Sequence, residues 1–209
     1  VLTWDAATRA EGVALLRDVT STAARPDAEE ALGEVLTWNA ATRSEGIEHL
    51  RRLQVQHPDR VSTRLKLAEA LSWSADTRDE SEAIYRAILH SDGMSVEATV
   101  GLARVLSWTG RFAESRDTYR QALQRDPAGS AALVGLAQLD GWSGQARASL
   151  QRLAAGTAAS LETPDAYQVR AEAYSQIGRP ASAARARSMA LDTSIRSPIP
   201  LGSISLSVQ

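Results

Sequence analysis

The chain has 209 residues, of which 44% are hydrophobic, 5% aromatic and 23% charged, and its formal net charge is −2. This balance excludes the basic surface expected of a nucleic-acid-binding protein, and no apolar run approaches the ~20 residues of a membrane-spanning helix. The absence of cysteine excludes disulfides and thiolate metal sites.

Tryptophan recurs along the chain at a nearly fixed interval. Successive tryptophans are separated by 34, 35, 35 and 34 residues, and they are Trp4, Trp38, Trp73, Trp108 and Trp142. Three glycines follow the same period, at intervals of 34 and 34, and they are Gly110, Gly144 and Gly178. A fixed period of this size indicates stacked repeats, each of which is one small supersecondary unit.

The repeats fill most of the chain in order. An incomplete repeat covers residues 1–25, and repeats follow at 26–60, 61–95, 96–129, 130–163 and 164–192. Each complete repeat is predicted to contain two helices, because its apolar residues recur at spacings of three or four. Thr163 and Pro164 are predicted as the N-cap and first helical residue of the sixth repeat. The tail at 193–209 is Ser/Pro-rich and then alternates apolar and polar residues, which fits either an irregular end or a strand.

The fourth repeat shows the two-helix pattern most clearly. In its first helix Leu102 and Leu106 lie at helical spacing, with Ala103 beside them. Gly110 is predicted to end this helix, because glycine adopts the left-handed C-cap conformation without strain. The second helix carries one stripe of residues, formed by Phe112, Ser115, Tyr119 and Ala122. Pro127 ends that helix, since proline cannot continue the hydrogen-bond ladder.

The first three repeats have a different turn, which is one residue longer and lacks the glycine. In each turn a threonine is followed three residues later by a glutamate, a spacing that predicts a capping box at the start of the second helix. The pairs are Thr8 with Glu11, Thr42 with Glu45 and Thr77 with Glu80.

These residues resemble the pattern of the tetratricopeptide repeat, which has a period of 34 residues and two helices per repeat. The resemblance covers about residues 1–192 and implies an all-α fold, a right-handed superhelical solenoid of about six antiparallel helix pairs. Small residues at equivalent positions, such as Gly33 and Ala103 on first helices and Ser115 on a second helix, are expected where two helices approach closely. In the family the first helices line a concave groove that commonly holds a peptide or a partner helix.

If that geometry applies, the groove positions can be named. The expected partner-binding residues are Asp27, Glu30, Glu34, Glu69, Glu97, Arg104 and Gln138. The N-terminal half of this wall is acidic, and the Lys, Arg and Asn clamp with which chaperone-binding family members hold a carboxylate terminus is absent. A basic or polar protein partner is therefore expected, and not an acidic C-terminal peptide. The alternative is that the carboxylates form a solvated face with no ligand.

The tryptophan row has two interpretations. Each indole ends a first helix, so the rings are interpreted first as wedges between neighbouring repeats, because large aromatic side chains contribute mainly buried area. The functional alternative is an aromatic ladder along the groove that stacks on sugar rings or apolar side chains. The residues of that ladder would be Trp38, Trp73, Trp108 and Trp142.

No signal for catalysis is found in the sequence. His49, His57 and His90 lie in separate segments without a second ligand at helical spacing, and neither a phosphate-binding glycine loop nor a nucleophile elbow is present. We therefore expect no catalytic residues, no metal and no cofactor. The function predicted from the sequence is a non-catalytic scaffold that binds a protein or peptide in its concave groove.

A second hypothesis comes from resemblance alone. The recurring LSW-x-G segment and the strand-like tail are similar to bacterial periplasmic scaffolds of exopolysaccharide export, in which a repeat array precedes an outer-membrane barrel. That resemblance implies a periplasmic location and contact with the synthesis machinery or with a polysaccharide. Because the chain begins within a repeat, it is expected to be part of a longer protein. Self-association through the ends of the stack remains open.

Overall fold

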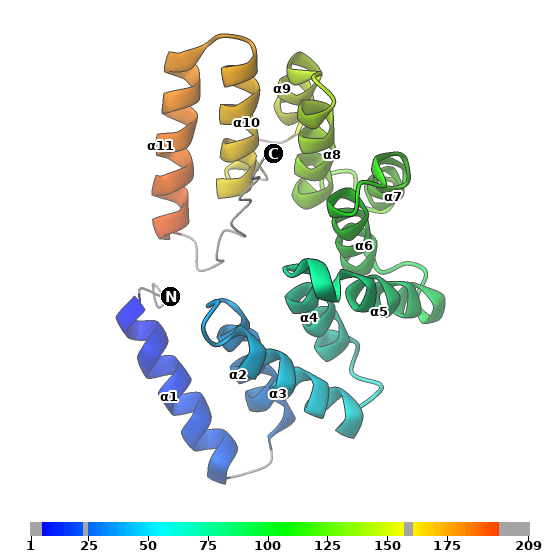
Figure 1. Ribbon diagram of the computed structural model, residues 1–209, viewed down its shortest axis with the longest axis vertical. Helices are drawn as coiled ribbons and strands as arrows, with labels where there is room; N and C mark the ends of the chain where they lie inside the picture. Colours follow the sequence, from blue (N-terminus) through cyan, green and yellow to red (C-terminus); the bar gives the residue numbers. More distant parts are fainter. Residues whose placement is uncertain (1–5, 23–24, 157–160, 197–209) are drawn as a thin grey trace. The chain divides into compact units, whose positions relative to one another are not determined.

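The computed structural model describes residues 6–22, 25–156 and 161–196, and every regular element in these ranges is helical (Figure 1). The elements are α1 (Ala6–Thr22), α2 (Pro26–Thr37), α3 (Arg43–Gln56), α4 (Val61–Ser72), the 3-10 turn η1 (Ala75–Thr77), α5 (Arg78–Ser91), α6 (Val96–Trp108), α7 (Phe112–Arg125), α8 (Ser130–Trp142), α9 (Ala146–Ala155), α10 (Pro164–Gln176) and α11 (Pro180–Arg196). No helix in the described ranges is long and apolar enough to cross a membrane.

The chain divides into two compact units, Val1–Arg125 and Asp126–Gln209. In unit 1, α2 pairs with α3, α4 with α5 and α6 with α7, and the first helices α2, α4 and α6 contact one another in sequence. Helix α1 packs on α2 and is the second helix of the incomplete first repeat. In unit 2, α8 pairs with α9 and α10 with α11, and the first helices α8 and α10 contact each other. The all-α prediction of stacked helix pairs is confirmed.

Small residues allow the two helices of a repeat to approach closely, as predicted. A Cβ on Gly33 of α2 would lie 2.9 Å from the Leu50 side chain of α3, and one on Gly46 would lie 2.6 Å from the Gly33 carbonyl oxygen. In the fourth repeat Ala103 and Ser115 are both fully buried, and the Ser115 hydroxyl donates to the Ala103 carbonyl at 2.7 Å. Large residues fill the remaining core, so a bigger side chain at these positions would overpack the hairpin.

Two kinds of turn join the helices of a repeat. At Gly110, Gly144 and Gly178 the backbone has φ values of 79°, 74° and 72°, which confirms the predicted left-handed C-caps. Beyond Gly110, the Arg111 backbone N–H donates to the Leu106 carbonyl at 2.9 Å. This 6→1 bond is that of a Schellman motif, and equivalent bonds follow Gly144 and Gly178.

The second and third repeats end their first helices differently, and the capping boxes predicted there are wrong. Thr42 and Thr77 precede α3 and α5, but neither side chain accepts a capping bond. Instead the Thr42 hydroxyl donates backwards to the Leu36 carbonyl at 2.7 Å, and the Thr77 hydroxyl donates likewise to that of Leu71. These carbonyls are equivalent to that of Leu106, so a hydroxyl replaces the backbone N–H where no glycine is present. Thr8 lies among side chains outside the described set.

Two further predictions concern the start of the sixth repeat and the tail at the end of the chain. Thr163 is the N-cap of α10, with its hydroxyl accepting from the Ala166 N–H at 3.2 Å, and Pro164 begins the helix as predicted. Helix α11 runs to Arg196, so it includes the first residues that were assigned to the tail. The strand considered for the tail falls in 197–209, outside the described residues.

Candidate functional site

The predicted groove residues lie on two surfaces, one in each unit. We call the side of α2, α4 and α6 that carries Asp27, Glu34, Glu69 and Arg104 the first-helix face of unit 1. The equivalent side of α8 and α10, which carries Gln138, is the first-helix face of unit 2.

The carboxylates at the N-terminal end of the unit 1 face are already paired. Arg60, just before α4, donates to Asp27 at 2.6 Å and to Glu30 at 3.4 Å. Glu30 is only 8% exposed, and its carboxylate also accepts from the hydroxyls of Ser62 and Thr63. Glu30 therefore joins α2 to α4 and has little surface left for another molecule.

The pairing continues along the same face. Lys66 on α4 donates to Glu34 on α2, and Arg104 on α6 donates to Glu69 on α4 at 3.2 Å. Glu97 is exposed and makes no ion pair with any described residue. Most of the acidic charge expected from the sequence is therefore neutralised within unit 1. Arg60 and Lys66, which neutralise it, were not predicted as partners of these carboxylates. The signal that could have found them is spacing, since Arg60 and Lys66 follow their acidic partners Asp27 and Glu34 by 33 and 32 residues.

Arg104 is the centre of an aromatic cluster on this face. Its guanidinium carbon lies 5.9 Å from the ring centroid of Trp73 and 5.6 Å from that of Trp108. The two indole rings have centroids 5.6 Å apart and an interplanar angle of 43°, and Arg78 lies 5.4 Å from the Trp108 ring. We call Trp73, Arg104 and Trp108 the tryptophan–arginine cluster.

The cluster has both a buried side and a solvent side. Both indoles are partly exposed, and the described residues provide no hydrogen-bond acceptor for either indole N–H. Next to Arg104, Tyr85 is 2% exposed, and a Cβ on Gly101 would lie 2.3 Å from its ring. Burial raises the pKa of Tyr85 to about 12, against the opposing effect of Arg104. The tyrosine is therefore neutral at ordinary pH, and Arg104 keeps its full charge beside it.

The other two described tryptophans of the predicted row lie at the ends of α2 and α8. They are Trp38 and Trp142, which are partly buried and have contacts of their own. Trp73 and Trp108 form a ring contact in unit 1. The structure thus brings these two predicted ladder residues together.

On the first-helix face of unit 2, Gln138 and Glu172 occupy the repeat position that Glu69 and Arg104 occupy in unit 1. The Gln138 Nε2 atom on α8 is buried and has no hydrogen-bond partner among the described residues. At the equivalent position of α10, Glu172 is partly buried and forms no hydrogen bond or ion pair within the described part of the chain. Burial raises the pKa of Glu172, and the charge of Arg187 on α11 acts in the opposite direction.

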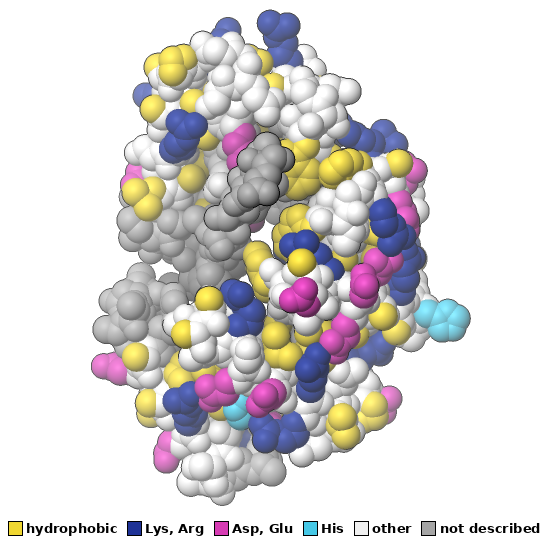
Figure 2. All heavy atoms as spheres, viewed as in Figure 1, with side chains coloured by type: hydrophobic (Ala, Val, Ile, Leu, Met, Phe, Trp, Pro, Cys, Tyr) yellow, Lys and Arg dark blue, Asp and Glu magenta, His cyan; other side chains and the backbone are white. Residues whose placement is uncertain are grey.

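The second helices of unit 1 carry an ion-pair ladder. Arginines on α1, α3 and α5 bond a glutamate on the second helix of the next repeat, in the pairs Arg17–Glu45 at 2.7 Å, Arg51–Glu80 at 2.6 Å and Arg86–Glu114 at 2.8 Å. Figure 2 shows basic and acidic side chains interspersed over α5 and α7. Hydrogen bonds from Arg86 and Arg111 lower the pKa of Glu114. The residue 34 positions after Glu114 is Ala148, so the sequence does not continue the ladder there.

Solved structures identify the architecture. A tetratricopeptide repeat protein from Parabacteroides merdae superposes with a TM-score of 0.78 at 14% identity, over 90% of this chain and 73% of that one. A thermophilic TPR protein of Thermus thermophilus gives 0.69 at 13% identity, over 81% and 91%, and MamA gives 0.54 at 17% identity, over 75% and 91%. The chain has the tetratricopeptide repeat (TPR) fold. Neither a protein-family model nor a curated protein sequence matches it.

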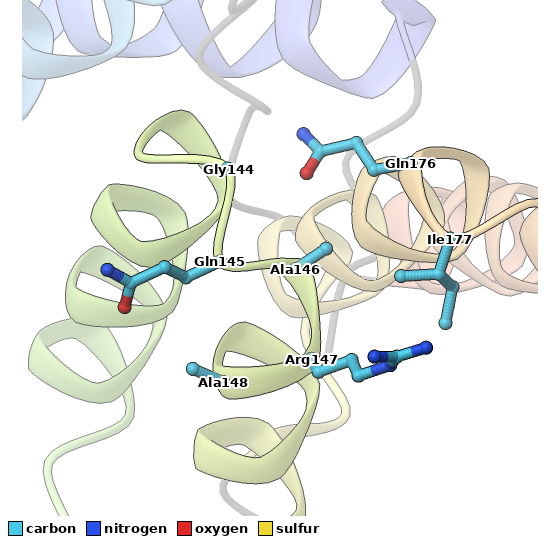
Figure 3. A pocket seen from close by; sticks show the side chains of 7 residues that line it. All are labelled: Gly144, Gln145, Ala146, Arg147, Ala148, Gln176 and Ile177. Carbon is cyan, nitrogen blue, oxygen red and sulfur yellow. The ribbon is translucent and has the colours of Figure 1, made fainter.

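One open depression lies at the turn end of the TPR hairpins of unit 2. It has a volume of about 530 Å³ and is lined by Gly144, Gln145, Ala146, Arg147, Ala148, Gln176 and Ile177. Figure 3 shows that these residues come from the turn before α9, the first residues of α9 and the end of α10. Arg147 is the charged residue in this lining, and no predicted groove residue belongs to it.

The described residues contain no group of three or more His, Asp or Glu side chains that could hold a metal ion. The polar features of the TPR hairpins are instead ion pairs, hydroxyl-to-carbonyl bonds and the tryptophan–arginine cluster. These features can position a partner by shape, stacking and hydrogen bonding.

Proposed function

We propose that this TPR chain is a non-catalytic scaffold that binds a protein partner through the first-helix face of unit 1. The tryptophan–arginine cluster is the anchor of that contact. The TPR fold supports a protein-interaction role in general, and the cluster supports this particular surface.

The observation that carries the proposal is the composition and preorganisation of the cluster. Interface residues that dominate binding energy are enriched in Trp and Arg and are surrounded by contacts that exclude water. Trp73 and Trp108 are partly exposed, and Arg104 is held against both rings and also bonds Glu69. A partner would lose little additional entropy in ordering these side chains, because they already contact one another.

Charge pairing narrows the expected partner at this face. The carboxylates of Asp27, Glu30 and Glu34 are matched by Arg60 and Lys66, so the surface offers little net charge to attract a strongly basic segment. Arg104 is already bonded to Glu69, which disfavours capture of an acidic C-terminal peptide. The partner proposed for unit 1 is therefore a polar segment with an apolar side chain that packs on the indoles.

Selection from a random peptide library against the intact chain tests this surface. Selected peptides should bind Trp73→Ala and Trp108→Ala at least about tenfold more weakly, since truncation of a dominant interface residue costs ~2 kcal/mol or more. Val55→Ala is a matched control, because Val55 is an apolar side chain on α3 that is 82% exposed. Equal binding to all three variants would remove the cluster from the proposal.

A polysaccharide is the second candidate ligand. The observation that favours it is the same pair of partly exposed indoles, whose faces could stack on sugar rings. The proposals of a periplasmic location and of a role in exopolysaccharide export depend on this candidate. Acidic and neutral bacterial polysaccharides should then change the intrinsic tryptophan fluorescence of the intact chain, and Trp73→Phe with Trp108→Phe should remove the change. An unchanged spectrum at saturating polysaccharide would exclude this candidate.

Self-association through the ends of the stack also stays a prediction. Leu15 on α1 is 68% exposed and Met189 on α11 is 40% exposed, so the first and the last described helix both carry apolar surface. Sedimentation velocity over a range of concentrations distinguishes a monomer from an associating chain, and Leu15→Lys with Met189→Lys should abolish any association.

A further inference from the structure

Arg78 is a cation that adjoins the tryptophan–arginine cluster. It is the first residue of α5, and its guanidinium carbon lies 5.4 Å from the Trp108 ring centroid. Its Nε atom donates to the Ser72 carbonyl at 3.3 Å, which fixes the guanidinium at a second point. No carboxylate in the described part of the chain forms an ion pair with Arg78. The charge is therefore held in place without being neutralised.

The two terminal nitrogens of Arg78 are open to an incoming group. Arginine has five N–H donors in a planar fork, and the bond to Ser72 uses the donor on Nε. Neither terminal nitrogen bonds a described residue, and neither is among the buried atoms that lack a partner. The side chain as a whole is half-buried, so its terminal fork stays accessible to solvent.

The neighbouring charges do not satisfy this fork. Three carboxylates lie close to Arg78 in the sequence, and they are Asp76, Asp79 and Glu80. None of them forms an ion pair with Arg78, and the last of them bonds Arg51 at 2.6 Å. Arg104 lies 5.6 Å from the same Trp108 ring, but it bonds Glu69 at 3.2 Å. Arg78 is thus the cation beside the indoles that has no acidic partner among the described residues.

The geometry indicates which chemistry would complete the site. A carboxylate matches an arginine fork, because its two oxygens accept two parallel N–H bonds. The Trp108 ring lies between this fork and the second indole, 5.4 Å from the Arg78 guanidinium and 5.6 Å from the Trp73 ring. Residues three or four apart on a helix have Cβ atoms ~5–6 Å apart. One helical turn of a partner therefore spans the distance between the fork and an indole face.

We infer that Arg78 binds an aspartate or glutamate side chain of the partner, while an apolar side chain one helical turn away packs on Trp73 and Trp108. This inference rests on the proposed function, because it assumes that a protein partner contacts the cluster. It adds an internal acidic side chain, and not a C-terminal carboxylate, to the requirements on that partner. Because Arg78 begins a second helix, the contact lies outside the predicted groove positions, which are all on first helices.

The test uses the intact ¹⁵N-labelled chain and an alanine-based helical peptide with an amidated C-terminus and one central leucine. Glutamates stand four residues before and four residues after the leucine, and the control peptide has glutamine at both positions. The glutamate peptide should shift the indole N–H resonances that disappear in Trp73→Phe and Trp108→Phe. It should bind at least about tenfold more tightly than the glutamine peptide, a difference of ~1.4 kcal/mol, since hydrogen bonds to charged groups are the stronger ones.

A double-mutant cycle separates a direct contact from an effect of Arg78 on the fold. Arg78→Gln should weaken binding of the glutamate peptide at least about tenfold and leave the glutamine peptide unchanged. Arg43→Gln is the matched control, because Arg43 begins α3 and its Nε atom donates to the Thr37 carbonyl at 3.2 Å in the same way. It should leave both affinities unchanged. An equal loss with both peptides in Arg78→Gln would show a structural role alone and would overturn the inference.

Other outcomes would also overturn the inference. These are equal binding of the two peptides to the unmodified chain and the absence of any indole response. An acidic polysaccharide that needs Arg78, where neither peptide binds, would assign the fork to the second candidate ligand and overturn it as well.

Failure of this inference and failure of the proposed function are distinguishable. Library peptides that require Trp73 and Trp108 but bind Arg78→Gln as tightly as the unmodified chain would refute the inference alone. Failure to select any peptide that requires these tryptophans would remove the proposed function and the inference together.

Discussion

Arg51 on α3 bonds Glu80 on α5 at 2.6 Å, and this contact is one rung of a ladder that repeats with the period of the sequence. Both side chains are nearly half exposed, so each rung is worth little by itself. The ladder connects consecutive second helices of unit 1, in each case from an arginine to a glutamate one repeat later.

Salt should weaken this connection. A double-mutant cycle of Arg51→Ala and Glu80→Ala is expected to give a coupling of about 0.2–1 kcal/mol at low ionic strength. The coupling should nearly vanish at ~1 M salt, where the Debye length is ~3 Å. The coupling free energy is measured by urea unfolding of the variants, with hydrogen exchange of the α5 amides as the local probe. Arg120 and Asp117, which pair within α7 at 2.9 Å, give the control cycle for a contact inside one helix. A coupling that salt does not change would contradict an electrostatic origin.

Substitution by alanine should change the stability with opposite signs at two glycines, Gly110 and Gly141. Gly110 has φ 79°, and a Cβ there meets no atom within 4 Å, so Gly110→Ala should destabilise unit 1 by about 1–2 kcal/mol through backbone strain alone. Gly141 lies within α8 without positive φ, and a Cβ there also meets no atom within 4 Å. Gly141→Ala should therefore stabilise unit 2 by up to ~1 kcal/mol, the difference in helix propensity. Thermal unfolding of both variants checks the pair, and a shift of the same sign would contradict it.

The sequence was sufficient to predict features that follow from local chemistry repeated at a fixed period. The left-handed glycines, the close approach of Ala103 and Ser115, and the N-cap at Thr163 each depend on one residue type at one position. The capping boxes failed because Thr42 and Thr77 had a competing acceptor, a carbonyl six residues earlier that only the folded turn brings within reach. Their predicted partners Glu45 and Glu80 bond arginines of the preceding repeat instead.

The groove residues stay a prediction, but the structure shows that the sequence prediction left out the ion-pair partners of their carboxylates. The residue pattern of a single helix identifies its carboxylates but not the cations that approach them from the next helix. Arg60 and Lys66 pair with carboxylates of α2 because α2 and α4 pack side by side. The unpaired state of Gln138 depends on what surrounds its amide in space, and no spacing in the sequence reports it.

Asp140 occupies a position where the repeat pattern expects a large apolar residue, and the structure shows a compensation. Asp140 is 1% exposed and accepts from Arg152 Nε of α9 at 2.9 Å. Arg152→Met should destabilise unit 2, because it removes a cation that donates to a buried carboxylate. Adding Asp140→Leu should recover part of that loss, since apolar residues often replace a buried ion pair without cost. Urea unfolding of the single and double variants measures both steps, and a double variant no more stable than Arg152→Met would show that Asp140 has another essential role.

The buried tyrosines predict how unit 1 responds to alkali. Burial raises the pKa values of Tyr85 and Tyr119 to about 12, while a tyrosine in the unfolded chain titrates near ~10. The folded state therefore holds these protons over a range in which the unfolded state has released them. The stability of unit 1 should be constant with respect to these groups below pH ~10 and should fall as the pH rises from ~10 towards about 12. Urea unfolding at a series of pH values gives the slope. Tyr85→Phe should reduce it, because the phenylalanine has no proton to lose, and an equal slope in that variant would show that other groups cause the alkaline loss.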